Sequence, residues 1–267
     1  MTEANSQSAL SFKSIRQSFA GQNGDAPLQV LNDISFDVPR GKFVSVIGPS
    51  GCGKSTLVQM AAGLLKPTGG QVLHNGTAVS GVNRTIGFVP QQAQLLPWKT
   101  MMENVEFPLL LRGVGADERR ARAQEAIDKV DLSGFERHYP YQLSGGMQKR
   151  VSIARMLVYK PDTILMDEPF GALDAQTRMV MQHDLQNMLA AEGASVLFVT
   201  HDITEAVTLS DSVVVLSRRP ARILAEVQID LPRPRDMFEP HTIAGFAEAY
   251  DRVWSMFRSE LKVRPAA

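Results

Sequence analysis

The 267-residue chain is long enough to bury a sizeable core, as one domain or as one domain with an inserted lobe. Its 28 Lys and Arg residues balance its 28 Asp and Glu residues, so the overall charge gives no reason to expect nucleic-acid binding. A single cysteine excludes an intrachain disulfide, and no apolar run approaches the roughly 18 residues of a membrane span. The polar residues 1–7 lack the apolar centre of a signal peptide.

The sequence pattern of the N-terminal third predicts several strands and one helix. Residues 11–19 and 28–38 alternate apolar and polar positions, which predicts two strands separated by a loop at 21–25. The β-branched run 42–47 predicts a buried strand, and residues 55–65 predict a helix with one apolar face. Further short strands are predicted at 71–73, 85–89, 163–167, 195–200 and 212–216.

The middle of the chain differs in character, because residues 105–159 are mostly helical in pattern and more charged, above all at 116–130. We therefore expect a core at roughly 8–91 and 161–225, interrupted by a helical lobe at roughly 92–160. Apolar residues at spacings of three and four also predict an amphipathic helix at roughly 240–262. Packing on the core is the favoured interpretation of this helix, and binding of a partner is the alternative.

The first chemical motif is a glycine-rich loop between the predicted strand 42–47 and the helix that follows. It matches G-x-x-x-x-G-K-[ST] and consists of Gly48, Pro49, Ser50, Gly51, Cys52, Gly53, Lys54, Ser55 and Thr56. Such a P-loop wraps nucleotide phosphates with backbone N–H groups, and its Lys54 and Ser55 would bind the β- and γ-phosphates and Mg²⁺. A glycine-rich turn with a chance lysine is the alternative, which the strand–loop–helix context disfavours.

One side chain of this loop carries a separate hypothesis. Cys52 lies beside Lys54 and among backbone dipoles, which favour a thiolate, so we hypothesise that it is reactive. The alternative is that Cys52 is only a small residue that fills space.

Acidic and histidine side chains end two later strands. Asp167 and Glu168 follow the predicted strand 163–167, at the edge where open α/β sheets bind ligands. There Asp167 can hold Mg²⁺ and Glu168 can polarise the water that attacks a γ-phosphate. His201 ends the strand at 195–200 and can contact the same phosphate and water. The alternatives are two solvated acids and a structural histidine.

A second anion-binding device occurs at 143–150. Ser144, Gly145 and Gly146 form a short turn that opens a helix, with Ser144 at the N-cap and Gln148 one turn later. The unpaired N–H groups of such a helix end suit a phosphate. Because the chain already has one phosphate cradle, the second device suggests a nucleotide held by another copy.

These motifs, in this order, resemble the ATP-binding subunit of an ATP-binding-cassette (ABC) transporter over at least residues 11–223. The matching motifs are the P-loop, the Q-loop glutamine Gln91 with Gln92 beside it, the signature at 143–148, the acidic strand motif at 164–168, the D-loop at 172–174 and the switch histidine His201. Phe19 matches the aromatic residue that stacks on adenine, with an ordinary core phenylalanine as the alternative. The resemblance implies a single ABC ATPase domain, with a P-loop NTPase (RecA-like) α/β core, an antiparallel β subdomain and an inserted helical subdomain.

The resemblance also implies a mechanism. Two copies pair head to tail, with each ATP between one P-loop and the other copy's signature, and hydrolysis reopens the pair. It assigns catalytic roles to Glu168, His201 and Gln91, Mg²⁺ to Ser55, Gln91 and Asp167, and nucleotide contacts to Phe19, the P-loop residues, Ser144, Gly145, Gly146, Gln148 and Asp174. The implied partners are a second copy, a transmembrane permease and, indirectly, a solute-binding protein. The implied location of the chain is the cytoplasmic face of the membrane, where the permease holds it.

Two local patterns narrow the family. Residues 94–99, with Leu95, Leu96 and Trp98, and residues 218–223 look like the subunits of importers for nitrate, sulfonate or taurine. The three apolar residues could seat a permease helix, or could instead belong to the core of the lobe. Two other function classes stay open: a soluble ABC ATPase of DNA repair or translation, which usually carries a long coiled-coil insertion, and a P-loop kinase or nucleotide switch. Another solute also stays open, since the resemblance implies that the solute does not touch the ATP-binding subunit.

Overall fold

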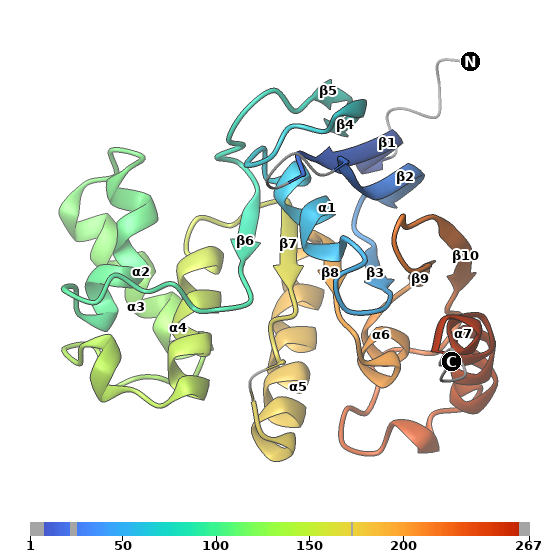
Figure 1. The fold of residues 1–267 in the computed structure, drawn as a ribbon. Helices are drawn as coiled ribbons and strands as arrows, with labels where there is room; N and C mark the ends of the chain where they lie inside the picture. The colour runs from blue at the N-terminus through green and yellow to red at the C-terminus, as the bar shows by residue number, and fades with distance from the viewer. Residues whose placement is uncertain (1–7, 22–25, 172, 262–267) are drawn as a thin grey trace. The chain divides into compact units, whose positions relative to one another are not determined.

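The computed structural model of the chain describes residues 8–21, 26–171 and 173–261 (Figure 1). It divides into two compact units, of which the first runs up to Arg84 and resumes at Ser195, and the second is Thr85–Ala194. This division leaves β7 (Thr163–Asp167) and α5 (Ala175–Glu192), which follow the helical lobe in sequence, in the same unit as the lobe.

Ten strands and seven α-helices are assigned within the described ranges. The elements of the first unit are β1 (Ser8–Phe19), β2 (Leu28–Pro39), β3 (Phe43–Ile47), α1 (Lys54–Ala61), β4 (Gly69–His74), β5 (Thr77–Ala78), β8 (Ser195–Val199), α6 (Ile203–Leu209), β9 (Ser212–Leu216), β10 (Ile223–Gln228), a 3₁₀ turn at Pro240–Thr242 and α7 (Phe246–Leu261). Those of the second unit are β6 (Gly87–Val89), α2 (Met101–Leu110), α3 (Ala116–Lys129), a 3₁₀ turn at Pro140–Gln142, α4 (Gly145–Leu157), β7 and α5.

The first unit contains an antiparallel sheet in the order β2-β1-β4-β5 and a set of mainly parallel strands. In the second set β3 lies between β8 and β9 and runs parallel to both, while β10 pairs with β9 in the antiparallel sense. Strands β3, β8 and β9 are buried along their whole length, as their continuous apolar sequences predict. Val46 pairs with Val199 and Ile47 with Val215, so the carboxyl ends of the three strands meet at one edge.

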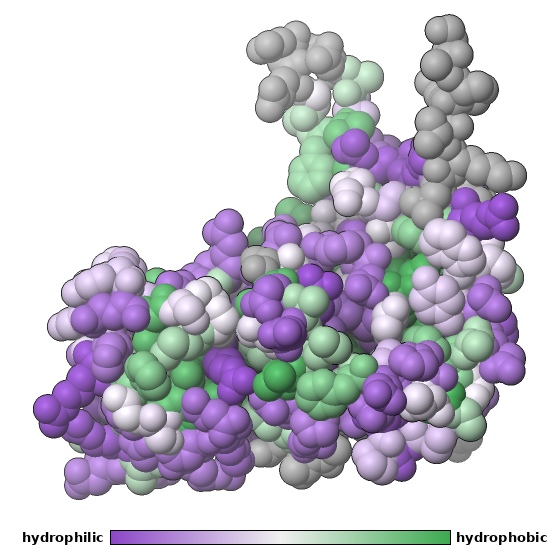
Figure 2. All heavy atoms as spheres, turned by 90° about the horizontal axis from the view of Figure 1, so that it is seen from below, coloured by the Kyte–Doolittle hydropathy of each residue, from purple (hydrophilic) through white to green (hydrophobic). Residues whose placement is uncertain are grey.

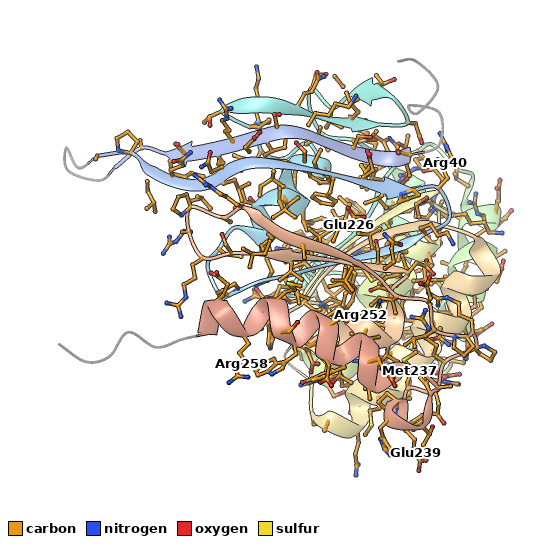
Figure 3. The ribbon with its side chains drawn as sticks, turned by 90° about the vertical axis from the view of Figure 1, so that its right-hand side faces the viewer. Arg40, Glu226, Met237, Glu239, Arg252 and Arg258 are labelled. Carbon is orange, nitrogen blue, oxygen red and sulfur yellow. The ribbon has the colours of Figure 1, made fainter. Side chains whose placement is uncertain are left out.

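Helix α7 packs on α6 and on the strand pair β9 and β10 of the first unit, as Figures 1 and 3 show. Its buried face consists of Phe246, Ala249, Val253 and Phe257, which join one apolar cluster with residues of α6 and β9. On its other side Arg252, labelled in Figure 3, donates a hydrogen bond to the Gln228 carbonyl at the end of β10. The predicted packing of this helix on the core is therefore confirmed.

Arg235, in the segment between β10 and α7, is only 2% exposed. Its guanidinium donates to five backbone carbonyls, those of Val207, Thr208, Ser210, Ile229 and Leu231. Three of these belong to the last turn and C-cap of α6, where a cation also complements the helix dipole. Burial lowers the pKa of Arg235 to about 10, which leaves it charged at neutral pH.

The second unit combines the short parallel pair β6 and β7 with helices α2, α3 and α4 between them in sequence. Thr100 and Glu103 form a capping box at the start of α2. The fully buried Asn104 holds the preceding turn, because its amide donates to the carbonyls of Leu96, Lys99 and Thr100. The α/β fold class is confirmed, with an antiparallel sheet and a helical insertion as the resemblance implies.

Two local expectations differ from the structure. The helix predicted at 55–65 ends at Ala61, because Gly63 adopts φ +73° and a Cβ there would lie 1.8 Å from the Gly81 carbonyl oxygen. Strand β10 was not predicted, although its alternating burial is typical of a strand with one covered face.

Helix length and surface character both bear on the question of a membrane span. None of the helices in the described part of the chain combines the length and apolar character needed to cross a membrane. Figure 2 shows one face of the molecule, on which hydrophilic residues surround smaller hydrophobic groups. Such a mixture is normal for the surface of a globular protein.

Candidate active site

The P-loop joins β3 to α1 in the first unit. Gly51 and Gly53 adopt φ +73° and +117°, values that other L residues rarely adopt. Gly53 also has no room for a side chain, since a Cβ would lie 2.6 Å from Leu31 Cδ2 and 2.9 Å from Val30 Cγ1. A Cβ at Gly51 would instead meet no atom within 4 Å. One glycine therefore fits the loop beneath β2, and the other leaves open space for a ligand.

Lys54 is the first residue of α1 and is 5% exposed. Its ammonium group donates to the Gly48 carbonyl at 2.9 Å and to the Pro49 carbonyl at 3.4 Å. The charge thus lies across the turn of the loop, where it can exchange carbonyl oxygens for phosphate oxygens. Ser55 and Thr56 follow in the first turn of the helix and are half-buried.

Cys52 lies behind the loop. Its side chain is 1% exposed, and its Sγ would be 2.8 Å from a Cβ at Gly48. Its backbone N–H donates to the Pro49 carbonyl, which keeps the turn closed. Burial raises the pKa of the Cys52 thiol, and the nearby charges of Lys54 and Arg219 only partly oppose that rise. The hypothesis of a reactive thiolate is therefore wrong, and Cys52 fills space beneath the loop.

His201 and Phe19 are the other predicted site residues of the first unit. His201 is exposed directly after β8, at the edge where β3 enters the P-loop, and the Thr200 N–H donates to the Val46 carbonyl of β3. Asp202 caps α6 by accepting from the N–H groups of Thr204 and Glu205. Phe19 ends β1 and is 40% exposed, which excludes an ordinary core phenylalanine and leaves its ring available for stacking.

In the second unit the structure brings Gln91 and Glu168 together. The parallel register pairs Val89 with Met166, so the residues after β6 and β7 leave the same edge. The Gln91 amide donates to Glu168 Oε2 at 3.4 Å, which favours Gln91 over Gln92 as the Q-loop glutamine. Asp167 is 8% exposed, whereas Glu168 is half-buried and adopts φ +43°, a strained value of the kind that clusters at functional sites.

The signature motif opens α4. Ser144 is its N-cap, and the hydroxyl accepts from the Met147 N–H at 3.3 Å. A Cβ at Gly145 would meet no atom within 4 Å, so this helix end presents open space. Gln148 is used within the chain, because its amide donates to the Pro140 and Leu143 carbonyls and holds the preceding turn. A nucleotide contact from Gln148 stays a prediction.

The D-loop borders the signature. Asp174 caps α5, and the Thr177 backbone N–H holds the pKa of Asp174 below its ordinary value. A Cβ at Gly146 would lie 3.1 Å from Thr177 Cγ2 and 3.9 Å from Leu173 Cδ2. The starts of α4 and α5 are thus in close proximity. Ala172, also part of this predicted motif, lies outside the described residues.

Two cations of α4 were missed by reasoning from sequence. Lys149, which is 5% exposed, donates to the carbonyls of Pro90 and Gln91, and Arg155 donates to those of Ala93 and Gln94. Burial lowers the pKa of Lys149 to about 8, and the Asp167 carboxylate opposes this shift. Both partners are backbone atoms some sixty residues away, so no local sequence signal could have found them.

The predicted Mg²⁺ ligands are a hydroxyl, an amide and a carboxylate, from Ser55, Gln91 and Asp167. These are oxygen donors of the kind that Mg²⁺ prefers, and Mg²⁺ normally adds waters and substrate phosphates to so few protein ligands. Within the described ranges no cluster of three or more His, Cys, Asp or Glu side chains suits a metal ion. The donor set therefore fits Mg²⁺ that arrives with a nucleotide.

Comparison with known proteins agrees with the motifs. Residues 31–171 match the ABC transporter family. An ABC transporter ATP-binding protein of Methanocaldococcus jannaschii is 48% identical over 234 residues, which are 88% of this chain and 86% of that protein. A taurine import ATP-binding protein of Burkholderia pseudomallei is 44% identical over 213 residues, 80% of this chain and 82% of that one.

A solved structure is also similar. It is the dimeric, post-hydrolysis state of an ATP-binding cassette bound to ADP and phosphate, with a TM-score of 0.75 and 34% identity. The match covers 82% of this chain and 98% of that chain.

Proposed function

The chain belongs to the ABC transporter family, and we propose that it is the ATP-hydrolysing subunit of an importer for a small sulfonate, taurine or nitrate-like solute. One observation carries the proposal: a complete P-loop in the first unit and a signature helix in the second unit whose Gly145 faces open space. A helix end of this kind suits an anion, and a nucleotide held by a second copy would supply one.

The P-loop residues Gly48 to Thr56 bind the phosphates of ATP, with the exposed Phe19 ring stacked on the adenine. Lys54 binds the β- and γ-phosphates, and backbone N–H groups around Gly51 approach them closely because no side chain intervenes. Ser55, Asp167 and Gln91 would hold Mg²⁺ bound with the nucleotide, which would supply positive charge against the charge that develops on the transferred phosphoryl group.

Hydrolysis needs a base and an oriented water. Glu168 orients and polarises the attacking water, and its hydrogen bond with Gln91 fixes the carboxylate in place. His201, at the edge that also carries the P-loop, contacts the γ-phosphate. Ser144, Gly145, Gly146 and Gln148 complete the site of the second copy, and Asp174 couples the two sites. Because ATP contacts both copies, its binding closes the dimer and its hydrolysis reopens it.

A transmembrane permease is the proposed partner that makes this cycle useful, and through it the chain is held at the cytoplasmic face of the membrane. A solute-binding protein is an indirect partner, which acts through the permease. The support from this chain is an apolar surface beside the Q-loop. Trp98 is 71% exposed, which argues against the alternative of lobe core packing, and Leu95 and Leu96 are half-buried next to it. An exposed tryptophan of this kind is typical of a protein interface.

The decisive variant is Glu168→Gln, which keeps the shape of the side chain and removes the base. We expect ATP binding to persist, turnover to fall by about 10²- to 10⁴-fold, and an ATP-bound dimer to accumulate. Light scattering during gel filtration with ATP and Mg²⁺ measures the dimer. Glu106→Gln, which breaks only the ion pair with Arg119 in the helical lobe, is the matched control. Turnover at the wild-type rate in Glu168→Gln would remove Glu168 from the role of base.

The transport assignment has its own test. The subunit is expressed in its host, and the host's membranes are extracted with mild detergent. The proteins that copurify with the subunit are then identified. Recovery of a multi-span permease is the expected result, followed by ATP-driven uptake of taurine, an alkyl sulfonate or nitrate into vesicles. Activity on DNA or ribosomes without any membrane partner would instead support the soluble ABC ATPase.

A further inference from the structure

The segment that follows β6 carries Gln91 and is held almost entirely through its carbonyl oxygens. Residues 90–94 form neither helix nor strand, so their backbone groups need other partners. Lys149 Nζ donates to Pro90 O at 2.6 Å and to Gln91 O at 2.9 Å. Arg155 donates to Ala93 O at 2.9 Å and to Gln94 O at 3.0 Å. Four of the five carbonyls are thus held by two cations.

Both cations belong to α4, the helix that begins with the signature motif. Lys149 is five residues from the N-cap Ser144, and Arg155 lies in the last turn. Burying a lysine whose hydrogen bonds go to carbonyl oxygens is costly, because its charge loses water and the Asp167 carboxylate offsets that loss only in part. Two neutral donors would have satisfied the same carbonyls at lower cost. A charged donor, in return, makes stronger and shorter hydrogen bonds to its acceptors.

We propose that Lys149 and Arg155 are positioning residues that tie residues 90–94 to α4, so that a displacement of the signature end of α4 is transmitted to Gln91 and its contact with Glu168. We call this pair the α4 clamp. A nucleotide of the second copy that draws on the start of α4 would thereby set the geometry of the Q-loop in this copy. The inference deepens the proposed function and rests on its assignment of Gln91 and Glu168.

A double-mutant cycle tests whether Lys149 acts through Gln91. Lys149→Met keeps the length and apolar stem of the side chain and removes its donors. We expect kcat to fall about tenfold and KM for ATP to change less than about twofold, because positioning is lost and phosphate binding is not. In a Gln91→Ala background the same change should lower kcat by less than about twofold further.

The matched control is Arg122→Met. Arg122 belongs to the same helical lobe and also donates to a backbone carbonyl, that of Val158 after α4, at 3.2 Å. It does not touch residues 90–94. In the double variant, the fold-change in kcat caused by Arg122→Met, whatever its size, should multiply the fold-change caused by Gln91→Ala, since the two residues are independent.

Hydrogen–deuterium exchange gives a readout that needs no catalysis. Lys149→Met should speed exchange in peptides covering residues 91–98 and leave those of α3 unchanged, whereas Arg122→Met should not affect 91–98. Lys149→Gln, which retains an amide donor, should restore part of the protection and part of kcat. It also keeps the test open if the methionine variant fails to fold.

Two results would overturn the proposal: full multiplicative loss of kcat in the Lys149→Met, Gln91→Ala double variant, or wild-type exchange at 91–98 in Lys149→Met. A wild-type protein that did not hydrolyse ATP would refute the proposed function instead, and hydrogen exchange would still decide whether the clamp holds the segment.

Discussion

Two helix starts in this molecule offer backbone N–H groups to an anion, and they are built differently. Helix α1 follows a loop with two positive-φ glycines and has Gly53, without a side chain, at its N-cap. It brings its own cation, Lys54. Helix α4 begins from an ordinary Ser144 cap, and its first four residues include no cation. Under the proposed function the first start is a complete phosphate site, whereas the second is completed by the nucleotide of another copy.

Removal of the cation Lys54 should reveal the largest difference between the starts of α1 and α4. Lys54→Ala deletes charge-assisted hydrogen bonds worth about 1.5–3 kcal/mol each, so we expect ATP affinity to fall by roughly 10- to 100-fold. Calorimetric titration of the isolated subunit measures it. Lys66→Ala, on the exposed surface after α1, is the control and should bind ATP normally. Unchanged affinity in Lys54→Ala would deprive the P-loop of its assigned cation.

Gly145→Ala should affect only the second start. A methyl group there meets no atom of the chain, so the helix should keep its stability or gain up to about 0.5–1 kcal/mol. Hydrolysis should nevertheless fall at least about tenfold, because in the proposed dimer the methyl group would occupy the space of the other copy's γ-phosphate. Denaturant unfolding and steady-state ATPase assays measure the two effects. A loss of stability with an unchanged rate of ATP hydrolysis in Gly145→Ala would contradict the interpretation that Gly145 leaves space for a ligand.

Smaller effects on stability and hydrolysis are expected from replacing the N-cap residues of α4 and α2. Ser144 and Thr100 both accept a backbone N–H at 3.3 Å, and both start helices of the second unit. Each alanine variant should lose about 1 kcal/mol of stability. Only Ser144→Ala should also lose hydrolysis, by about three- to tenfold, since the proposed dimer places its hydroxyl at the shared nucleotide. Equal ATPase loss in both variants would mean that Ser144 acts through helix stability alone.

The smallest effect concerns Cys52. Because burial raises its pKa, the thiol stays protonated at pH 7–8, and iodoacetamide should alkylate it more slowly than free cysteine. Above pH 9.0, the ordinary pKa of cysteine, the unfolded chain releases the thiol proton of Cys52, whereas the folded chain keeps it. This contribution to stability is therefore present below pH 9.0 and lost as pH rises through the folded pKa. Mass spectrometry with timed alkylation checks it, and rapid labelling at pH 7 would contradict it.

What the sequence predicted was local. The P-loop was found because strand, glycines, lysine and helix are consecutive, and the acidic pair because it ends an apolar run. The same reasoning failed for Cys52, since Lys54 is visible beside it in sequence and the contact beneath Gly48 is not. Lys149 and Arg155 were missed because their partners are carbonyl oxygens, which every residue possesses. A side chain that forms hydrogen bonds to backbone atoms far away in the sequence produces no residue pattern from which the contact could be predicted.

Arg235 gives the C-terminal part of the chain a significance for protein engineering. Its guanidinium joins the carbonyls that end α6 to those that follow β10, so one side chain closes two segments at once. Shortening the chain ahead of Arg235 would leave up to five buried carbonyls without this donor, each worth about 1–3 kcal/mol. A shortened variant that keeps α6 and the end of β10 joined must therefore retain Arg235.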